Sequence, residues 1–376
     1  MKNLFANILI FFVVFSFIGC RSRNNSTHDE KLCDSIVTNQ YAEYFKIEYF
    51  EHYKKITVLN PWKENAVFDC YYLSKDSLPF SDGTFIQTPI KNVIATSCSL
   101  FEFFHLINET NKISGVCDIK RIYNKEIQEK YQNKELDDVG SAFAINMEKV
   151  LRINPSAVFI NGFNEDDQNG NRIKSMNIPT IYTIEWVEKN ALARAEWIKF
   201  VAAFFDKEQY ADSIFKEIEH NYNSSKALVS QIKQKPTILS GNSFNGVWYL
   251  PGGKSFLAQL YNDAGGNFNY KNDDSMGSLT LDFETILEYY HDADIWLNAV
   301  VNNRNELLNQ EARLTYFKPI KENKVYNFNK RCTSTGGNDY WETAIARPDI
   351  LLKDIISVIH PEILDHYEPF FINAVE

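Results

Sequence analysis

The chain has 376 residues, with 39 basic and 49 acidic side chains, a net charge of −10 and an aromatic content of 14%. This acidity excludes the class of nucleic-acid-binding proteins that neutralise phosphates with a basic surface. A hydrophobic content of 44% predicts a globular protein with a substantial core, and at roughly 150 residues per domain we expect two domains.

The amino terminus predicts export from the cytoplasm. One basic residue precedes an apolar run at 4–19, which is shorter than the roughly 20 residues of a membrane-spanning helix. This pattern predicts a signal peptide over residues 1–20. Gly19-Cys20 resembles the lipobox of bacterial lipoproteins, although Phe17 departs from its usual aliphatic residue, and the resemblance implies a lipid anchor on Cys20 in a periplasm-facing or cell-surface membrane. An ordinary secretory signal and an uncleaved core helix are the alternatives.

Five cysteines follow Cys20, and no two of them form a CxxC pair. This spacing argues against a zinc ribbon and against a thioredoxin-like redox site. An oxidising compartment permits one or two disulfides, whose connectivity stays open. The five are Cys33, Cys70, Cys98, Cys117 and Cys332.

The first half of the chain predicts a tether followed by an α/β lobe. Residues 21–40 are polar and lack a hydrophobic period, which is typical of a flexible tether. Strand-like runs over 41–59 predict an edge hairpin. Short apolar runs then alternate with helical spacing, so residues 41–190 predict a lobe with a parallel sheet. We expect strands at 92–96, 157–160 and 178–182, and a helix at 97–107.

A long helix is expected in the middle of the chain. Apolar residues at spacings of three, four and seven predict a helix of about 39 Å over 207–232, within a connecting segment at 191–233. The α/β pattern restarts over 234–376. We expect strands at 237–239, 293–297 and 325–326, a helix from Ser255 and a last helix at 348–358. The predicted fold class is α/β, with two lobes joined by one long helix.

An internal repeat supports two related lobes. Residues 146–151 precede the expected strand at 157–160, and residues 282–287 precede the one at 293–297. Both segments have the order capping residue, apolar residue, Glu, any residue, β-branched residue and Leu. The match is short, so chance similarity is the alternative.

Sequence motifs give no support for an enzyme. Gly253-Lys254-Ser255 lacks the glycine that a phosphate-binding loop needs five residues earlier, where Trp248 stands. Gly241–Asn245 lacks the final glycine of a nucleophile elbow. The seven histidines include no HExxH motif, and paired acids such as Asp273-Asp274 lie in polar loops. We therefore expect neither a catalytic site nor a bound metal or cofactor.

Aromatic residues beside glycines mark two expected loops, 246–253 and 336–342. Loop aromatics offer large apolar faces to a ligand at low entropic cost. Burial of each side chain beneath its own loop is the alternative. The residues concerned are Trp248, Tyr249, Tyr340 and Trp341.

The order and spacing of longer segments resemble one family, the substrate-binding proteins of ABC importers for iron-siderophores, haem and cobalamin. The resemblance covers about residues 60–370. The first half carries NVIATSCSLFEFFHLINETNKISGV, DVGSAFAINMEKVLRINPSAVFI and NIPTIYT, followed by RAEWIKFVAAFFDKEQYADSIFKEIEHNY. The second half carries WYLPGGKSFLAQLYNDAGGNFNY and NDYWETAIARPDILLKDIISVIHPEIL.

This resemblance implies two Rossmann-like lobes with a ligand cleft between them, one connecting helix and little domain closure. Similar proteins hold a bulky chelate between aromatic side chains from both lobes. Arg347 is expected to meet carboxylates of the ligand, whereas a salt bridge on its own helix is expected for Arg194. The implied aromatic contacts are Phe143 and Phe163 in the first lobe, and Trp248, Tyr249, Tyr340 and Trp341 in the second.

The family also docks to its permease through one acidic side chain per lobe, and such charge pairs favour orientation and association rate. Glu148 matches the first-lobe position. The second lobe departs from the pattern, because Lys254 stands where relatives can have glutamate, and Glu284 is the substitute. Glu102 is a further candidate. The alternative for Glu148 and Glu284 is a favourable interaction with their own helix dipole, worth ~0.3–1 kcal/mol.

The leading hypothesis is a lipid-anchored, monomeric binding protein that captures an iron-siderophore or a haem-like chelate and delivers it to ABC permease subunits. A cobalamin carrier of the same class and a surface or adhesion lipoprotein without a transport role are alternatives. A hydrolase or metalloenzyme is a third alternative, and it would show turnover that one cleft substitution abolishes.

Overall fold

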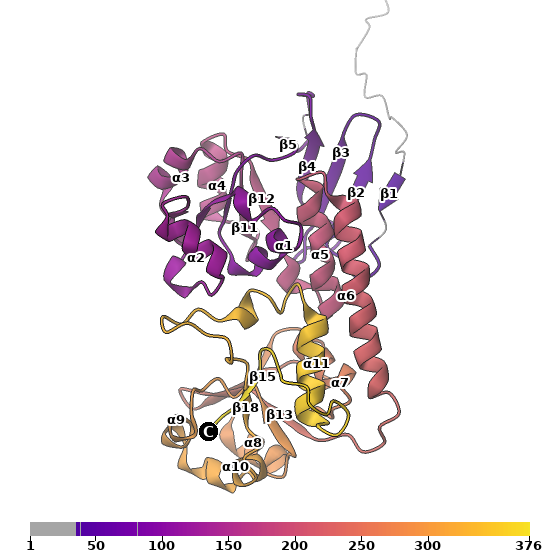
Figure 1. Ribbon diagram of the computed structural model, residues 1–376, viewed down its shortest axis with the longest axis vertical. Coiled ribbons are helices and arrows are strands. Elements are labelled where there is room, and N and C mark those ends of the chain that lie inside the picture. Colours follow the sequence, from indigo (N-terminus) through magenta and orange to yellow (C-terminus); the bar gives the residue numbers. More distant parts are fainter. Residues whose placement is uncertain (1–34, 38, 81) are drawn as a thin grey trace, which may run out of the picture. The chain divides into compact units, whose positions relative to one another are not determined.

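The computed structural model describes residues 35–37, 39–80 and 82–376 (Figure 1). The predicted signal peptide at 1–20, the predicted lipidation site Cys20 and residues 21–34 of the predicted tether lie outside the described residues. The described chain is a mixed α/β protein of two lobes, which confirms the predicted fold class.

The first lobe begins with a five-stranded sheet of order β1-β2-β3-β4-β5. Its strands are β1 (Ser35–Val37), β2 (Phe45–Tyr49), β3 (Lys54–Leu59), β4 (Val67–Ser74) and β5 (Thr84–Gln87). The predicted hairpin is present as β2 and β3, but it is not at an edge, because β1 and β4 flank it. β1 falls inside the segment predicted as tether.

A parallel sheet of order β12-β11-β6-β7-β8 forms the rest of this lobe, as predicted. The strands are β6 (Val93–Ala95), β7 (Ile113–Val116), β8 (Asp137–Asp138), β11 (Ala157–Asn161) and β12 (Thr180–Thr183). Between them lie α1 (Phe101–Leu106), α2 (Lys125–Gln132), α3 (Met147–Ile153), α4 (Gln168–Ser175) and the small hairpin of β9 (Gly140–Ser141) and β10 (Ala144–Ile145). Every residue of β11 is buried, which is typical of a central parallel strand.

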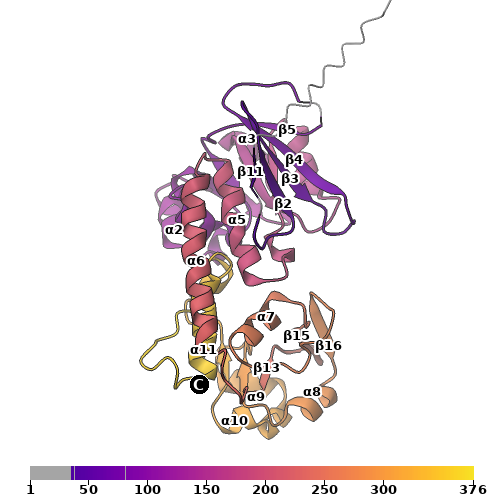
Figure 2. The same cartoon turned by 90° about the vertical axis from the view of Figure 1, so that its right-hand side faces the viewer.

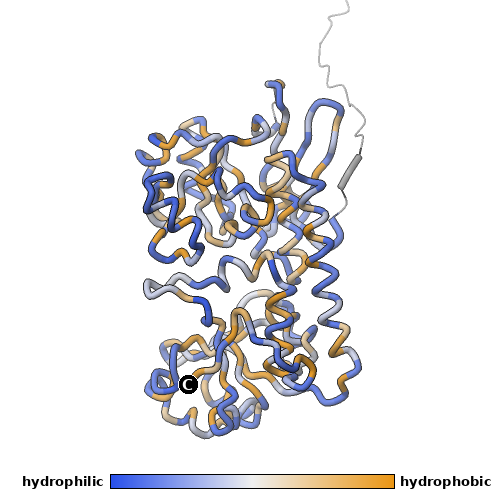
Figure 3. Tube along the Cα trace, viewed as in Figure 1, coloured by the Kyte–Doolittle hydropathy of each residue, from blue (hydrophilic) through white to orange (hydrophobic). Residues whose placement is uncertain are grey.

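Two helices, α5 (Ala191–Ala203) and α6 (Glu208–Leu228), link the lobes. Phe45 of β2 packs edge-to-face on Trp197 of α5, with ring centroids 5.0 Å apart. α6 is shorter than predicted, and its 21 residues span about 31 Å. It packs beside α5 and α11 (Pro348–Ile359) (Figure 2). Hydrophobic and hydrophilic residues alternate along α6, whereas α11 is largely hydrophobic (Figure 3).

The second lobe has a parallel pair at its centre, β13 (Ile238–Ser240) and β17 (Ile295–Leu297). A parallel bridge between Trp296 and Val325 adds the segment of β18 (Tyr326–Asn327), which pairs with β19 (Asn373–Ala374). A separate antiparallel sheet contains β14 (Asn242–Phe244), β15 (Val247–Pro251) and β16 (Ser278–Leu281). The helices are α7 (Phe256–Asp263), α8 (Phe283–Tyr290), α9 (Arg304–Gln310), α10 (Lys318–Lys321) and α11.

The internal repeat has a structural counterpart in each lobe. Asn146 caps α3, and its side chain accepts a hydrogen bond from the backbone N–H of Lys149. Asp282 caps α8 and accepts one from the backbone N–H of Thr285. Each helix leads into a parallel strand, β11 in the first lobe and β17 in the second.

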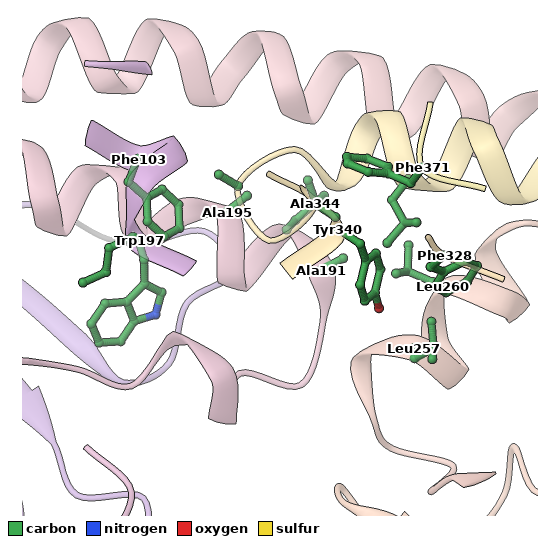
Figure 4. Close-up of a cluster of buried hydrophobic side chains, with 14 of the residues drawn as sticks. Phe103, Ala191, Ala195, Trp197, Leu257, Leu260, Phe328, Tyr340, Ala344 and Phe371 are labelled. Carbon is green, nitrogen blue, oxygen red and sulfur yellow. The ribbon is translucent and has the colours of Figure 1, made fainter. Parts of the chain in front are cut away.

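One hydrophobic core runs through both lobes. At their junction Tyr340 lies between residues of α5 and residues of the second lobe (Figure 4). The two lobes therefore share packed side chains as well as the connecting helices. The neighbours of Tyr340 in this cluster include Ala191 and Ala195 of α5, Leu257 and Leu260 of α7, Phe328, Ala344 and Phe371.

Within the part of the chain that the structure describes, none of the helices is both long enough and apolar enough to cross a membrane. The four cysteines in this part are free thiols, so the disulfides left open by the sequence do not form among them. Cys33 lies outside the described residues.

Candidate functional site

One cavity lies where strands of both lobes end, the position at which open α/β sheets bind ligands. This inter-lobe cavity has a volume of about 750 Å³. Trp186 and Arg194 line it from the first lobe, and Tyr249 and Phe256 line it from the second. Further aromatic side chains in its wall are Tyr44, Trp62 and Phe244.

A second cavity, here the first-lobe cavity, is lined by the loops after β6, β7 and β11 and has a volume of about 340 Å³. Phe143 and Phe163 line it and are 81% and 51% exposed. The ring centroid of Phe163 lies 5.9 Å from that of Phe143 and 5.8 Å from that of Trp186. Because Trp186 lines the inter-lobe cavity, these three rings form one aromatic surface between the two cavities.

Two thiols also line the first-lobe cavity, those of Cys98 and Cys117. Burial raises the pKa of each thiol to about 12, so both stay protonated at neutral pH. Among the residues described by the structure, no group of three or more His, Cys, Asp or Glu side chains is arranged to hold a metal ion.

Strand geometry separates the predicted pair Trp248 and Tyr249. The sequence predicts a loop here, but Val247–Pro251 is strand β15, paired with β14 and β16. Side chains alternate between the faces of a strand, so Trp248 is fully buried and Tyr249 is 42% exposed. The Trp248 indole donates to the carbonyl of Ser240 at 2.9 Å. Trp248 is therefore a core residue, which corrects the expectation that it is a cavity wall.

A short 3₁₀ turn, Asp339–Trp341, separates the second predicted pair in the same way. Tyr340 is 4% exposed, and its ring centroid lies 4.9 Å from that of Phe328. Burial raises the pKa of Tyr340, while Arg194 lowers it. Trp341 is 57% exposed beside it. Tyr340 is thus a buried contact between the lobes, and Trp341 alone of this pair lies at the surface.

Arg194 lies in the wall of the inter-lobe cavity. Its guanidinium carbon is 3.8 Å from the ring centroid of Phe256, a cation–π contact from α5 to α7. It also donates to the carbonyls of Trp186 and Glu188. These contacts, rather than the expected salt bridge, hold the side chain. Burial lowers the pKa of Arg194 to about 10, opposed by the nearby Glu185, so Arg194 is charged at neutral pH.

Arg347 lies in another groove, formed by residues of α6, α11 and the carboxyl-terminal segment. Its guanidinium pairs with Asp349 at 2.8 Å, and this bond raises its pKa. The structure therefore places Arg347 at the start of α11 and away from the two cavities, which corrects its expected contact with the ligand.

Glu188 is a buried carboxylate in the wall of the inter-lobe cavity, only 2% exposed. It accepts hydrogen bonds from the backbone N–H groups of Glu43 and Tyr44 and from the indole N–H of Trp197. Burial raises the pKa of Glu188 to about 7 against the lowering effect of these donors. Glu188 therefore fastens the chain before β2 to the cavity wall.

The candidate docking acids lie on different helices. Glu148 is exposed in the first turn of α3. Glu284 is exposed in the first turn of α8, where its carboxylate pairs with Arg313 at 2.9 Å. Glu102 of α1 is half-buried and accepts a hydrogen bond of 3.4 Å from the Thr343 hydroxyl. Its position against the second lobe makes Glu102 a less exposed candidate than the other two.

Five aromatic residues in the cavity wall are missed by sequence reasoning: Tyr44, Trp62, Trp186, Phe244 and Phe256. A signal for Trp186 exists, because it comes three residues after β12 and the carboxyl ends of parallel strands meet at one edge. Trp62 also follows a strand, β3. Phe256 opens α7 directly after its capping residue Ser255, and no sequence signal directs it to the cavity.

Comparison with known proteins agrees with this geometry. A model of the periplasmic binding protein family matches residues 93–331. An uncharacterized lipoprotein of Methanocaldococcus jannaschii is 27% identical over 406 aligned positions, covering 96% of this chain and 94% of the relative.

Solved structures share the fold at low sequence identity. A periplasmic haem-binding protein of Pseudomonas aeruginosa is 13% identical with a TM-score of 0.58, and the match covers 76% of this chain and 98% of that one. A possible iron-binding periplasmic solute-binding protein of Staphylococcus epidermidis is 16% identical with a TM-score of 0.56, and the match covers 73% of this chain and 100% of that one.

Proposed function

This chain belongs to the periplasmic binding protein family, and we propose that it captures an iron-siderophore or a haem-like complex between its lobes and delivers it to the permease of an ABC importer. Members of this family are solute-binding proteins and not enzymes. The names of the two similar structures, one haem-binding and one described as possibly iron-binding, support this class of ligand.

One observation carries the proposal: aromatic side chains from both lobes line a single cavity. Trp186 faces it from the first lobe, and Tyr249 and Phe256 face it from the second. Its volume of about 750 Å³ lies within the roughly 300–1,000 Å³ typical of small-molecule sites. Ring faces bind the apolar body of a bulky chelate, and the charged Arg194 can pair with an anionic group at the edge of that chelate.

We further propose that the protein acts at a membrane surface. The lipobox-like Gly19-Cys20 supports lipidation of Cys20 after removal of residues 1–20, and the name of the archaeal relative, a lipoprotein, agrees with this. The exposed Glu148 and Glu284 support docking to a basic face of the permease.

Tryptophan fluorescence tests the binding function. Two of the six tryptophans, Trp62 and Trp186, line the inter-lobe cavity, so a bound chelate should quench their emission with one-to-one stoichiometry. The titration uses a panel of ferric siderophores, haem and cobalamin at submicromolar concentration. Replacing both residues, Trp62→Phe with Trp186→Phe, should remove most of the change for whichever ligand binds. Tyr316→Ala is the matched control, because Tyr316 is an exposed aromatic away from both cavities.

The panel also separates the alternatives. Quenching by cobalamin alone would make the protein a cobalamin carrier of the same class. The absence of quenching by every member would contradict the importer proposal and favour a surface lipoprotein that uses the same fold without transport. The absorption spectrum of protein purified from its native source gives an independent check, since haem, cobalamin and ferric chelates absorb at different wavelengths.

A further inference from the structure

A carboxylate of the second lobe is inserted into the first lobe. Glu342 follows the 3₁₀ turn Asp339–Trp341 and is only 2% exposed. It accepts hydrogen bonds from the backbone N–H groups of Tyr123 at 2.5 Å and Asn124 at 2.8 Å. Asn124 is the capping residue of α2 in the first lobe. Unpaired N–H groups at a helix start favour an anionic partner, so Glu342 holds this point of the first lobe.

The segment that carries Glu342, here called the strap (residues 331–347), contacts the first lobe at further points. The hydroxyl of Thr343 donates to Glu102 of α1, and the carbonyl of Trp341 accepts from the thiol of Cys98 at 3.9 Å. A Cβ built on Gly337 would come within 2.8 Å of the backbone of Ile122. The strap therefore fits closely along the loops that border the first-lobe cavity.

We propose that Glu342 is a positioning residue whose carboxylate latches the strap onto the first lobe and thereby sets the spacing of the two walls of the inter-lobe cavity. The connecting helices join the lobes along one side, and the latch ties them at a second point. Its effect on ligand affinity rests on the proposed function. The hydrogen bonds of the latch join protein atoms alone.

The stability of the latch depends on pH, because the strap and the first lobe together bury two carboxyl groups, those of Glu342 and Glu102. Burial raises the pKa of Glu342 to about 7, and Asp339 and Glu102 add to this while the N–H groups of Tyr123 and Asn124 oppose it. Burial raises the pKa of Glu102 to about 7 as well. The other titratable or charged groups that face this pair are His105, Cys98, Arg347, and Arg331, which pairs with Asp339.

Because both pKa values are raised, the latch is stronger at low pH than at high pH. A glutamate in water has a pKa of about 4.3, so the latched state binds protons more tightly than the released state. The latch is therefore strongest below about pH 4.5, weakens as the pH rises to about 7, and changes little above that. The strap is therefore held most firmly at mildly acidic pH, because burial of the two carboxyls costs least when they are protonated.

Hydrogen exchange of the full-length, ligand-free chain tests the latch. The readout is the protection factor of the peptide with Tyr123 and Asn124, corrected for intrinsic exchange at each pH. In the native chain this protection should fall by at least about tenfold between pH 5.5 and pH 8. Glu342→Ala should lower it at every pH, and Glu342→Gln should reduce the pH dependence to the part that Glu102 contributes. Glu288→Gln, at an exposed position of α8, is the control.

Two results would overturn the proposal: a flat pH profile in the native chain, or an unchanged profile in Glu342→Gln. The first result is measured on the native chain, and the second on a nearly isosteric variant. Both can therefore be interpreted even if Glu342→Ala has a folding defect. Protection of β11 in the same samples reports whether the first lobe is intact. Because no ligand is present, failure of the latch is distinct from failure of the proposed transport function.

Discussion

Tyr249 and Trp248 are neighbours in sequence with opposite roles in the structure. Tyr249 lines the inter-lobe cavity, so Tyr249→Ala should weaken binding of the chelate by at least about tenfold and change the free energy of unfolding by less than about 1 kcal/mol. Trp248 is fully buried, so Trp248→Ala should lower the free energy of unfolding by about 3–5 kcal/mol. Denaturant unfolding and fluorescence titration of both variants measure the two effects.

The conservative variant Tyr249→Phe keeps the ring face and serves as the control. It should bind the chelate nearly as well as the native chain if the ring face is the contact. A Tyr249→Ala variant with native affinity would mean that the ligand does not use this wall.

Glu188 gives a pH-dependent contribution to stability. Its pKa is about 7 in the folded chain because of burial, against an ordinary value of 4.5. The folded state therefore binds the proton more tightly, so the stabilising contribution is complete below about pH 4.5 and is lost as the pH rises through 7. A difference of this size corresponds to about 3 kcal/mol. Relative to Glu188→Gln, the native chain should lose stability between pH 5 and pH 8 in denaturant unfolding.

Glu43→Gln is the matched control for this measurement. Glu43 belongs to the same contact, but its carboxylate is exposed and pairs with Lys189 at the surface. Exposed ion pairs contribute at most about 1 kcal/mol, so this variant should keep the native slope. An identical slope in Glu188→Gln and the native chain would contradict the buried carboxyl as its source.

At the scale of single elements, the capping residues of the internal repeat allow a test in each lobe. Asn146→Ala and Asp282→Ala should each lower the free energy of unfolding by about 1 kcal/mol, because each removes a side-chain acceptor at a helix start. The two caps lie in different lobes, so the double variant should be additive within about 0.5 kcal/mol. Chemical denaturation measures all three chains.

Asn146→Asp and Asp282→Asn are the controls for the caps, since each keeps an oxygen acceptor. They should recover most of the stability lost in the alanine variants. Equal losses in the alanine and conservative variants would show that the caps do not account for the effect.

Local patterns predict most helices and strands of this chain but not every sheet neighbour. The parallel strands β6, β11 and β12 appear in the sequence as short buried runs, and Ser255 marks the start of α7. The antiparallel sheet of β15 is missed, because its partner β16 comes some 30 residues later in the chain. Burial alternates along Val247–Pro251 in the structure, but its residues are all apolar, so the sequence shows no alternation and the flanking glycines favour a loop there.

At the scale of the whole molecule, the two-lobed fold is predictable and the composition of the cleft is only partly so. Phe143, Phe163 and Tyr249 reach the cavities from segments that the resemblance indicates. Trp186 and Phe256 line the same cavity only after the lobes pack together, and no local pattern encodes that packing. Tyr340 is the opposite case. Its polar neighbours in the sequence indicate a surface position, but the contact between the lobes buries its side chain.

The proposed docking to a permease involves one acidic residue of each lobe. Glu148→Lys and Glu284→Lys should each lower cellular uptake of the identified chelate by at least about tenfold, because like charges across an interface cost several kcal/mol. Affinity for the chelate should stay native, since neither acid lines a cavity. In the native chain Glu284 already pairs with Arg313, so Arg313→Ala should free its carboxylate and leave uptake intact or improved.

Glu288→Lys provides the control for charge reversal, because Glu288 lies on α8 one helical turn from Glu284 and is also exposed. It should leave both uptake and affinity near their native values. Native uptake in both Glu148→Lys and Glu284→Lys would place the docking contact on other residues. Loss of chelate affinity in either variant would instead indicate that the substitution disturbs the lobe, since α3 packs against β7 and α8 packs against β15.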